Sequence, residues 1–526
     1  MKFRSATLVG TVAAGVLLLS ACGAGGTRHG DPGAVVTDGA LNITVPADPG
    51  NLSPHSTVAT TTRQVIAFGY DSLVTMDDNG KPKPWLAETW DASATEVTFT
   101  LRNGITCADG SPLTAQTVAD NYTWIADPAH GSPILGLFVP MGLTATADDG
   151  ARTVTLTSPT PNPFLTEMTG QAFIACSPVL NNPNDFSGAF DGTGMYALTD
   201  VKPGASYTLT RRSDYTWGPD GTTSETAGLP KTVTINVVTD NTTRANLLLS
   251  GDTNSATVIG PDAERVEASG IASIPMTASS TQMYFNHDPS RITADPAVRL
   301  ALVQGTNTQE IADILVGGQG SPTQSFQVGA PKICPLDDLY TSIPEFDADK
   351  AMKTLDTAGW TVGSDGTRTK DGKALTVKIL YRSGTESAAA FEYLASQWKK
   401  IGVDVSLRAA DTAVINGMLF SGEEGDWDIV DWAVGAPFPT LFVPFFSGTT
   451  VTNFARIDNP DYDNHVSAAM DKLGISGCSE WQDAERSIVA NADVLPIGWA
   501  DTSTYTDKFT ARMSFQIEPW SIRQTD

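Results

Sequence analysis

In residues 375–432, segments with the two-residue hydrophobic period of a strand alternate with segments that have the period of a helix. This order restricts the fold more than any other part of the chain. Leu375–Tyr381 and Val403–Leu407 alternate apolar with polar residues, and Trp427–Trp432 is the next strand that the pattern predicts. Helical periodicity fills the two intervals between them. The order strand–helix–strand–helix–strand predicts a parallel sheet with right-handed crossovers, and therefore an α/β fold.

The helix expected in the first interval starts at Thr385 and ends at Gly402. Its apolar residues fall on one helical face and are Phe391, Leu394, Trp398 and Ile401. Asp411 is the expected cap of the second helix.

Open α/β sheets bind ligands beyond the carboxyl ends of their strands. In this sheet those positions are Arg382, Asp431, Trp432 and the turn 433–440, and we expect them to converge on one crevice. Trp432 fits a core aromatic equally well, and a solvated surface cation is the alternative for Arg382.

The N-terminus has the order of a secretory signal. Lys2 and Arg4 precede an apolar run over residues 5–19, and Leu19-Ser20-Ala21-Cys22 follows. This last motif resembles the bacterial lipobox, in which the cysteine is diacylated and becomes the mature N-terminus. We therefore expect a lipoprotein signal peptide at 1–21, an acylated Cys22 and a Gly-rich flexible tether over 22–40. The alternative is an ordinary cleaved signal with a cysteine nearby by chance.

Charge and composition exclude several classes of partner. The net charge of −26 becomes −28 when Lys2 and Arg4 leave with the signal, so we expect neither nucleic acid nor anionic lipid headgroups as ligands. No later stretch has the ~18 consecutive apolar residues of a membrane span. We expect a body that is soluble, tethered by its end, monomeric and outside the cytoplasm.

Four cysteines remain when Cys22 is set aside for lipid, namely Cys107, Cys176, Cys334 and Cys478. In an oxidising compartment an even set predicts disulfides, and four cysteines allow three connectivities. The histidines are scattered and no cysteine pair has metal-site spacing, so we expect no zinc site and no cofactor. The sequence has no nucleophile elbow, no His-Glu-x-x-His and no phosphate loop, so we expect no enzyme. The acid pair Glu423–Glu424 is interpreted as solvated surface.

Eight short segments along the mature chain, in this order, resemble one family. They are Asn51–Pro54, Tyr70–Val74, Pro84–Trp90, Leu101–Asp120, Gly192–Tyr196, Tyr284–Asn286, Asp347–Trp360 and Asn453–Asp461. The series is similar to the family 5 extracytoplasmic solute-binding proteins of ABC importers, which include oligopeptide, dipeptide and nickel receptors.

The resemblance implies a two-lobed periplasmic-binding-protein-like fold of type II, enlarged by an extra subdomain, with mixed sheets flanked by helices. Lobe I would take residues 41–280, with the extra subdomain at about 75–190, and lobe II residues 281–500. Residues 501–526 would return to lobe I, with two hinge crossings near 275–282 and 498–503. Keeping each disulfide within one lobe then favours Cys107–Cys176 and Cys334–Cys478.

The resemblance also implies a function. The chain would be a lipid-anchored receptor that delivers a solute, in the first place a peptide, to an ABC permease in the membrane. The alternatives are a non-peptide solute (an oligosaccharide, an opine-like compound or a chelated metal) and an envelope regulatory lipoprotein that has lost transport.

Peptide-binding members of the family place an aspartate three residues after the tryptophan at the end of the third strand, and here that position is Gly435. Asp431 is a doubtful substitute, since strand neighbours point to opposite faces. Arg382 lies close to the sequence position at which dipeptide-binding members have an arginine that binds the carboxylate of the ligand.

Two further segments complete the candidate ligand site. Val58, Ala59 and Thr60 match a segment of lobe I whose backbone pairs with an extended peptide. The apolar run from Phe438 to Phe446 either lines a hydrophobic pocket or packs between the lobes.

Overall fold

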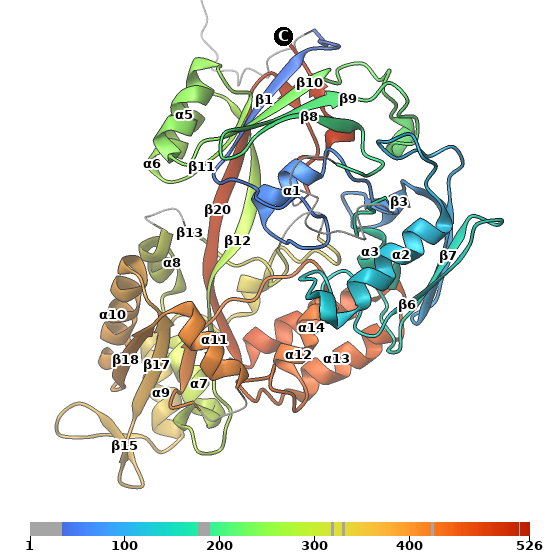
Figure 1. Cartoon of the computed structure of the whole chain (residues 1–526). Helices are drawn as coiled ribbons and strands as arrows, with labels where there is room; N and C mark the ends of the chain where they lie inside the picture. Colours follow the sequence, from blue (N-terminus) through green and yellow to red (C-terminus); the bar gives the residue numbers. More distant parts are fainter. Residues whose placement is uncertain (1–33, 177–189, 317–319, 329–331, 422–424, 515) are drawn as a thin grey trace, which may run out of the picture.

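The computed structural model describes residues 34–526 except 177–189, 317–319, 329–331, 422–424 and 515. The predicted signal at 1–21, Cys22, most of the tether and Glu423–Glu424 therefore lie outside the described residues. The chain forms two lobes, joined by a pair of long strands (Figure 1).

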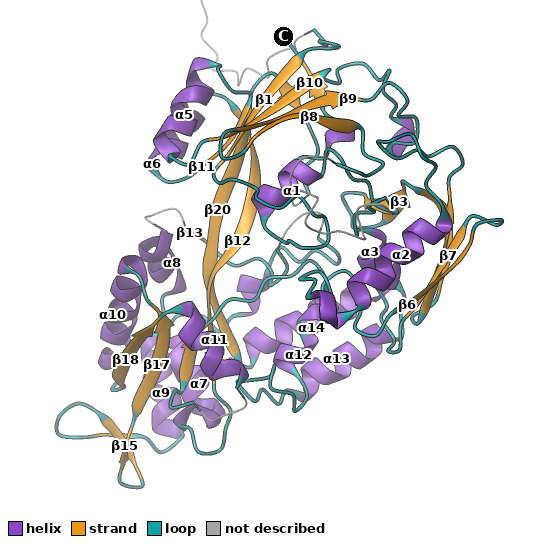
Figure 2. Cartoon of the chain, viewed as in Figure 1, coloured by secondary structure: helices purple, strands orange, loops and turns teal. Residues whose placement is uncertain are grey.

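The main sheet runs through both lobes in the order β18-β17-β19-β12-β20-β11-β1-β10-β9-β8, with β13 (Gly320–Ser321) also paired to β20. The strands are, in that order, Asp404–Ala410, Thr376–Arg382, Ile429–Asp431, Ala272–Phe285, Val494–Thr506, Ser255–Val258, Ala40–Val45, Thr232–Val237, Ser206–Arg211 and Tyr196–Lys202. Figure 2 shows β12 and β20 as the elements that cross from one lobe to the other.

The two long strands form one antiparallel ladder from Ala272↔Thr506 to Tyr284↔Val494. Its register shifts between Ser279 and Gln282, about midway along the ladder. The hinge ranges expected from the sequence, 275–282 and 498–503, lie within β12 and β20.

Lobe I consists of β11, β1, β10, β9 and β8 together with α1 (Thr60–Ile66), α5 (Asn241–Ser250) and α6 (Pro261–Ala268). The C-terminal segment packs into the core of this lobe through buried Phe509, Ile517, Trp520 and Ile522. Its short strands β21 (Phe509–Thr510) and β22 (Arg523–Gln524) pair with each other.

A smaller four-stranded sheet extends lobe I at one side, in the order β4-β5-β7-β6. Its elements are β4 (Ala87–Ala92), β5 (Glu96–Leu101), β6 (Thr144–Asp148) and β7 (Thr153–Thr157), with α2 (Ala115–Ala126) and α3 (Leu165–Gly170) beside them. The hairpin β2 (Val74–Met76) and β3 (Pro82–Pro84) connects this part to the chain before it. We call these elements the side subdomain.

Lobe II confirms the predicted α/β unit, because β17 pairs in parallel with both β18 and β19. α10 (Thr385–Lys400) buries Phe391, Leu394 and Trp398, and Gly402 follows it with φ of +87°. Asp411 is the N-cap residue of α11 (Thr412–Phe420), as predicted, but its side chain does not cap the helix. The Asp411 carboxylate makes no capping bond and instead accepts a hydrogen bond from the Ser383 hydroxyl at 2.6 Å.

The other helices of lobe II cover both faces of its sheet. One side carries α7 (Pro296–Gln304), α8 (Thr308–Val316) and α9 (Ala348–Thr357), and the other carries α12 (Val443–Phe446), α13 (Pro460–Met470) and α14 (Cys478–Ala490). The hairpin strands β14 (Thr361–Val362), β15 (Arg368–Lys370) and β16 (Lys373–Ala374) project from this lobe (Figure 1).

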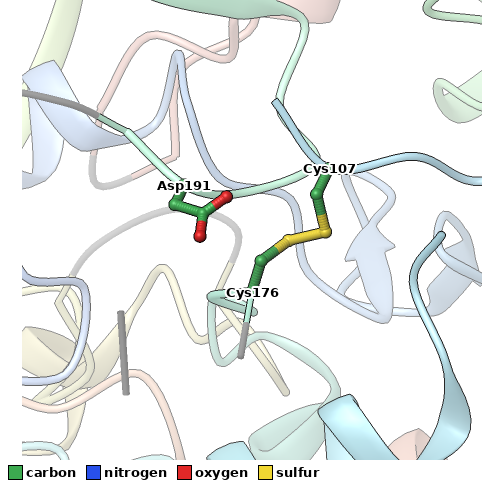
Figure 3. A group of neighbouring side chains, drawn as sticks. All are labelled: Cys107, Cys176 and Asp191. Atoms are coloured by element: carbon green, nitrogen blue, oxygen red, sulfur yellow. A yellow bond between two sulfur atoms is a disulfide. The ribbon is translucent and has the colours of Figure 1, made fainter. Parts of the chain in front are cut away.

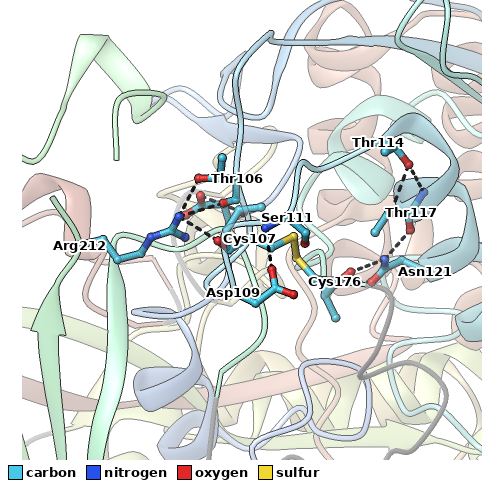
Figure 4. The surroundings of a disulfide bond; sticks show 12 residues. Thr106, Cys107, Asp109, Ser111, Thr114, Thr117, Asn121, Cys176 and Arg212 are labelled. Carbon is cyan, nitrogen blue, oxygen red and sulfur yellow. Dashed lines mark hydrogen bonds between the residues drawn. A yellow bond between two sulfur atoms is a disulfide. The ribbon is translucent and has the colours of Figure 1, made fainter. Parts of the chain in front are cut away.

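The structure pairs Cys107 with Cys176 and Cys334 with Cys478, the connectivity that the sequence analysis favours. Around the first bond, Arg212 donates from Nη2 to the Cys107 carbonyl at 3.1 Å, and Asn121 donates to the Ala175 carbonyl at 2.8 Å (Figure 4). Polar contacts therefore fix the backbone on both sides of this disulfide.

Candidate functional site

Arg382 and Asp431 form a bidentate ion pair where β17 and β19 end. Arg382 Nε donates to Asp431 Oδ2 at 3.0 Å and Nη2 to Oδ1 at 2.9 Å. The Asp431 side chain is 1% exposed and that of Arg382 31%. The Asp431 carboxylate is thus enclosed, while the Arg382 side chain reaches the surface. Asp431 therefore orients Arg382 and is too buried to contact a ligand directly.

Strand β12 supplies the third member of this group. Thr281 Oγ1 lies 3.4 Å from Arg382 Nη2. Because β12 also pairs with β19 through Met283↔Asp431, the ion pair lies next to one of the two strands that join the lobes.

Gln282 fixes the turn that follows β19. Its buried side chain donates from Nε2 to the Val434 carbonyl at 2.7 Å and accepts from the Val434 N–H at 3.1 Å. The same Oε1 accepts from the Tyr284 hydroxyl at 3.1 Å. The amide therefore replaces a backbone partner for the turn and holds it in one conformation.

Trp432 is partly exposed and belongs to an aromatic cluster. Its ring lies 5.4 Å from those of Phe445 and Phe454 and 5.5 Å from that of Phe420. Its Nε1 donates to Asn416 Oδ1 at 2.9 Å. The tryptophan is thus oriented from α11, with one side in the lobe II core and the other toward solvent.

The position of Gly435 is closed by another segment of the chain. A Cβ at this glycine would lie 2.6 Å from Val328 Cγ2. The Val328 N–H donates to the Ala436 carbonyl at 3.2 Å, so backbone hydrogen bonding keeps the two segments together. Any side chain at 435 must displace a stiff β-branched neighbour.

The segment that carries Val328 is tied to α14. Glu485 accepts hydrogen bonds from the Ser325 hydroxyl, at 2.8 Å, and from the Phe326 N–H. Burial raises the pKa of Glu485 to about 7, against these hydrogen bonds, which lower it. Gln327 donates to the Cys334 carbonyl at 3.0 Å, which links the same segment to the Cys334–Cys478 disulfide.

Phe438 is fully buried and packs against Phe164, with ring centroids 6.3 Å apart. Phe164 lies in the side subdomain, and its ring also lies 6.0 Å from that of Trp481 on α14. Of the two interpretations left open by the sequence, the structure places Phe438 in the packing between the two lobes.

Val58, Ala59 and Thr60 lie at the start of α1 in lobe I and are exposed. Among the described residues, no hydrogen bond joins these three to Arg382, Asp431 or Trp432. Of the predicted site residues, the structure therefore joins Arg382 to Asp431. Trp432 packs in the aromatic cluster, Gly435 against Val328 and Phe438 against Phe164, each in different surroundings from the ion pair.

Sequence reasoning missed three residues that shape this site: Gln282, Val328 and Glu485. Gln282 stands two residues before Tyr284–Asn286, a segment already singled out, and its place on a strand next to the crevice was a usable signal. Val328 precedes Gly435 by 107 residues and Glu485 follows it by 50, so no local pattern points to either residue.

One group of metal-ligand residue types occurs within the described ranges, formed by Cys107, Cys176 and Asp191 (Figure 3). Both sulfur atoms belong to the disulfide, so neither is a thiolate, the form of cysteine that binds metals. This group is therefore not assigned to a metal.

Comparisons with known proteins bear on the family and the fold of the chain. The family model of bacterial extracellular solute-binding proteins, family 5 middle, matches residues 81–453. The chain is 29% identical over 492 residues to Protein XP55 of Streptomyces lividans, covering 89% of this chain and 84% of that protein. It is 28% identical over 413 residues to the nickel-binding periplasmic protein of Escherichia coli (strain K12), covering 75% of each.

The solved structure of MppA, a periplasmic murein tripeptide binding protein in its unliganded open form, has the same fold, with a TM-score of 0.76 at 20% identity. The likeness covers 94% of this chain and 99% of that one, and confirms the two-lobed architecture. Among the described residues, none of the helices combines the length and the apolar character needed to cross a membrane.

The contact between Gly435 and Val328 predicts a steric cost. Gly435→Ala should lower the free energy of unfolding by about 1–3 kcal/mol, because overpacking forces the 325–328 segment to move. Adding Val328→Ala should remove most of that cost, so the double-mutant cycle shows coupling. Urea denaturation measures both.

Gly417→Ala is the matched control, since a Cβ at Gly417 in α11 meets nothing within 4 Å. It should be neutral or stabilising, by up to ~1 kcal/mol. A Gly435→Ala variant as stable as the parent protein, or additive with Val328→Ala, contradicts the steric account.

Proposed function

Because the chain belongs to the family 5 bacterial extracellular solute-binding proteins of ABC importers, we propose that it is a lipid-anchored receptor that binds a peptide between its lobes and delivers it to an ABC permease. Lobe I in this proposal comprises residues 41–280 and the tail 501–526, and lobe II comprises 281–500. The receptor works as a monomer outside the cytoplasm, held to the membrane through Cys22.

The observation that carries the proposal is the Arg382–Asp431 pair. A buried carboxylate fixes the guanidinium while about a third of the arginine side chain stays exposed, beside the strand β12 that joins the lobes. Nε and Nη2 of Arg382 already bind Asp431, so a ligand carboxylate would contact the exposed part of the guanidinium, whose fixed orientation reduces the entropy lost on binding. These features support recognition of the carboxylate of a peptide.

Closure is the second part of the proposal. Strands β12 and β20 cross from one lobe to the other, so bending of these strands would let the lobes approach, and the register of their ladder shifts at Ser279–Gln282. A solute that contacts both Arg382 and the segment Val58–Thr60 favours the closed form by its extra contacts. Arg382 thus links the solute directly to the hinge strand.

A non-peptide carboxylate is the second candidate, and Gly435 favours it. With no side chain and with Val328 against it, this position offers no acid to a peptide ammonium. Among the relatives, one is described as a nickel-binding protein and another, from the same bacterium, as a murein peptide-binding protein, so the relatives are not all named for peptides.

Arg382→Ala should weaken binding of a carboxylate-bearing solute by about 2–5 kcal/mol, because the ligand charge loses its partner in the crevice. Calorimetry with a mixture of short peptides, each as the free acid and as the C-terminal amide, measures this. The parent protein should prefer the free acids, and the variant should not distinguish the two forms.

Two variants serve as controls for this experiment. Arg382→Lys keeps the positive charge but loses the planar guanidinium group. The affinity of this variant should lie between those of the parent protein and Arg382→Ala. Arg408→Ala removes an exposed arginine from the neighbouring strand β18 and should bind like the parent. Unchanged affinity of Arg382→Ala removes Arg382 from the site, and binding of small carboxylates without peptides favours the second candidate.

Lipid anchoring predicts a covalent mark. In the native host the protein should sediment with membranes, and its N-terminal peptide should begin at Cys22 with the added mass of a diacylglyceryl group. Cys22→Ser should release the protein into the soluble fraction, since the apolar chains that hold it are absent. An unmodified cysteine in membrane-free parent protein contradicts the anchor.

A further inference from the structure

A second cleft, of about 430 Å³, lies away from the Arg382 site, between the side subdomain and the turn before α14. The side subdomain contributes β3, β4 and α3, and the turn contributes the residues around η7 (Gly474–Gly477). The members of this cleft that matter below are Lys81, Trp90, Glu167, Leu473, Gly474 and Ile475. We call it the α3 cleft.

Glu167 on α3 is the carboxylate that lines this cleft, and only 5% of the residue is exposed. Within the described part of the chain, no other residue makes a hydrogen bond or ion pair with its carboxylate. Burial raises the pKa of Glu167 to about 7. A buried carboxylate without a partner is costly, and a bound cation removes that cost.

The backbone opposite Glu167 leaves room beside the carboxylate. Gly474 has φ of +53°, and a Cβ there would lie 2.7 Å from Glu167 Oε1. The Gly474 N–H donates to the Pro163 carbonyl at 2.8 Å, which fixes the turn against the side subdomain. Only a residue without a side chain fits in this conformation at this distance.

The remaining walls are apolar and open to solvent. Leu473 is 46% exposed and Ile475 41% exposed, and Trp90 on β4 is half-buried. Trp90 offers an aromatic face, which attracts cations. Lys81 also lines the cleft, but among the described residues no ion pair joins it to Glu167.

We propose that the α3 cleft is a binding site for a small amphipathic amine, whose ammonium group pairs with the Glu167 carboxylate while its apolar body covers Trp90, Leu473 and Ile475. The site is separate from the solute site at Arg382. Because its two walls come from the side subdomain and from lobe II, a bound amine also joins these two parts.

Binding of 2-phenylethylammonium, measured by calorimetry at about pH 8, tests the proposal, because Glu167 is then largely ionised and the amine is still protonated. The amine should bind at least about tenfold more tightly than neutral 2-phenylethanol. Glu167→Gln should lose that preference, whereas Glu392→Gln, which changes an exposed acid on α10, should keep it.

Ile475→Lys is an independent test, since it places the chain's own ammonium at an exposed edge of the cleft without changing the buried carboxylate. It should weaken binding of the amine by about tenfold or more, by competition and charge repulsion. Three results overturn the proposal: equal affinity for the amine and the alcohol, unchanged binding by Glu167→Gln or by Ile475→Lys, or no saturable binding of the amine to the parent protein.

Discussion

The antiparallel ladder between β12 and β20 is the constraint on which the rest of the structure depends. It is the shared spine of both lobes, and β19, β11 and β13 pair with it directly. Thr281 and Gln282 stand where its register shifts, and they contact Arg382 and the turn after β19. A change in the bend of this ladder would therefore move the candidate site together with the lobes, and this is the coupling of solute binding to closure that we propose.

The Asp431 carboxylate holds the Arg382 guanidinium in one orientation at the candidate site. Burying a carboxylate is costly by several kcal/mol unless it is paired and hydrogen-bonded, and Asp431 meets this condition through two donors of one guanidinium. The arginine thereby loses rotamer freedom before any solute arrives. The Glu167 carboxylate differs, since it is buried and no described residue pairs with it. For this reason we propose a cation site at Glu167 and none at Asp431.

Local patterns in the sequence were sufficient to predict strands and helices of lobe II. They were not sufficient to predict which side chains contact each other across different strands and segments. Periodicity over 375–432 predicted the parallel strands. The four cysteines alone left three connectivities open, and the lobe boundary implied by the family resemblance favoured the two disulfides that the structure has. The sequence could not show that Asp431 pairs with Arg382, because facing side chains on separate strands depend on register. It also failed at Asp411, where Ser383 competes for the capping carboxylate, and at Gly435, whose neighbour Val328 arrives from a distant segment.

In the function proposed above, a solute held at Arg382 closes the two lobes about the β12–β20 ladder. Small-angle X-ray scattering of the protein with its co-purified solute, and again after the solute is removed by unfolding and refolding, tests this most directly, with native mass spectrometry to record occupancy. The account predicts a smaller radius of gyration in the occupied protein, and no such contraction in Arg382→Ala. A radius that stays the same while mass spectrometry shows the solute bound contradicts the claim.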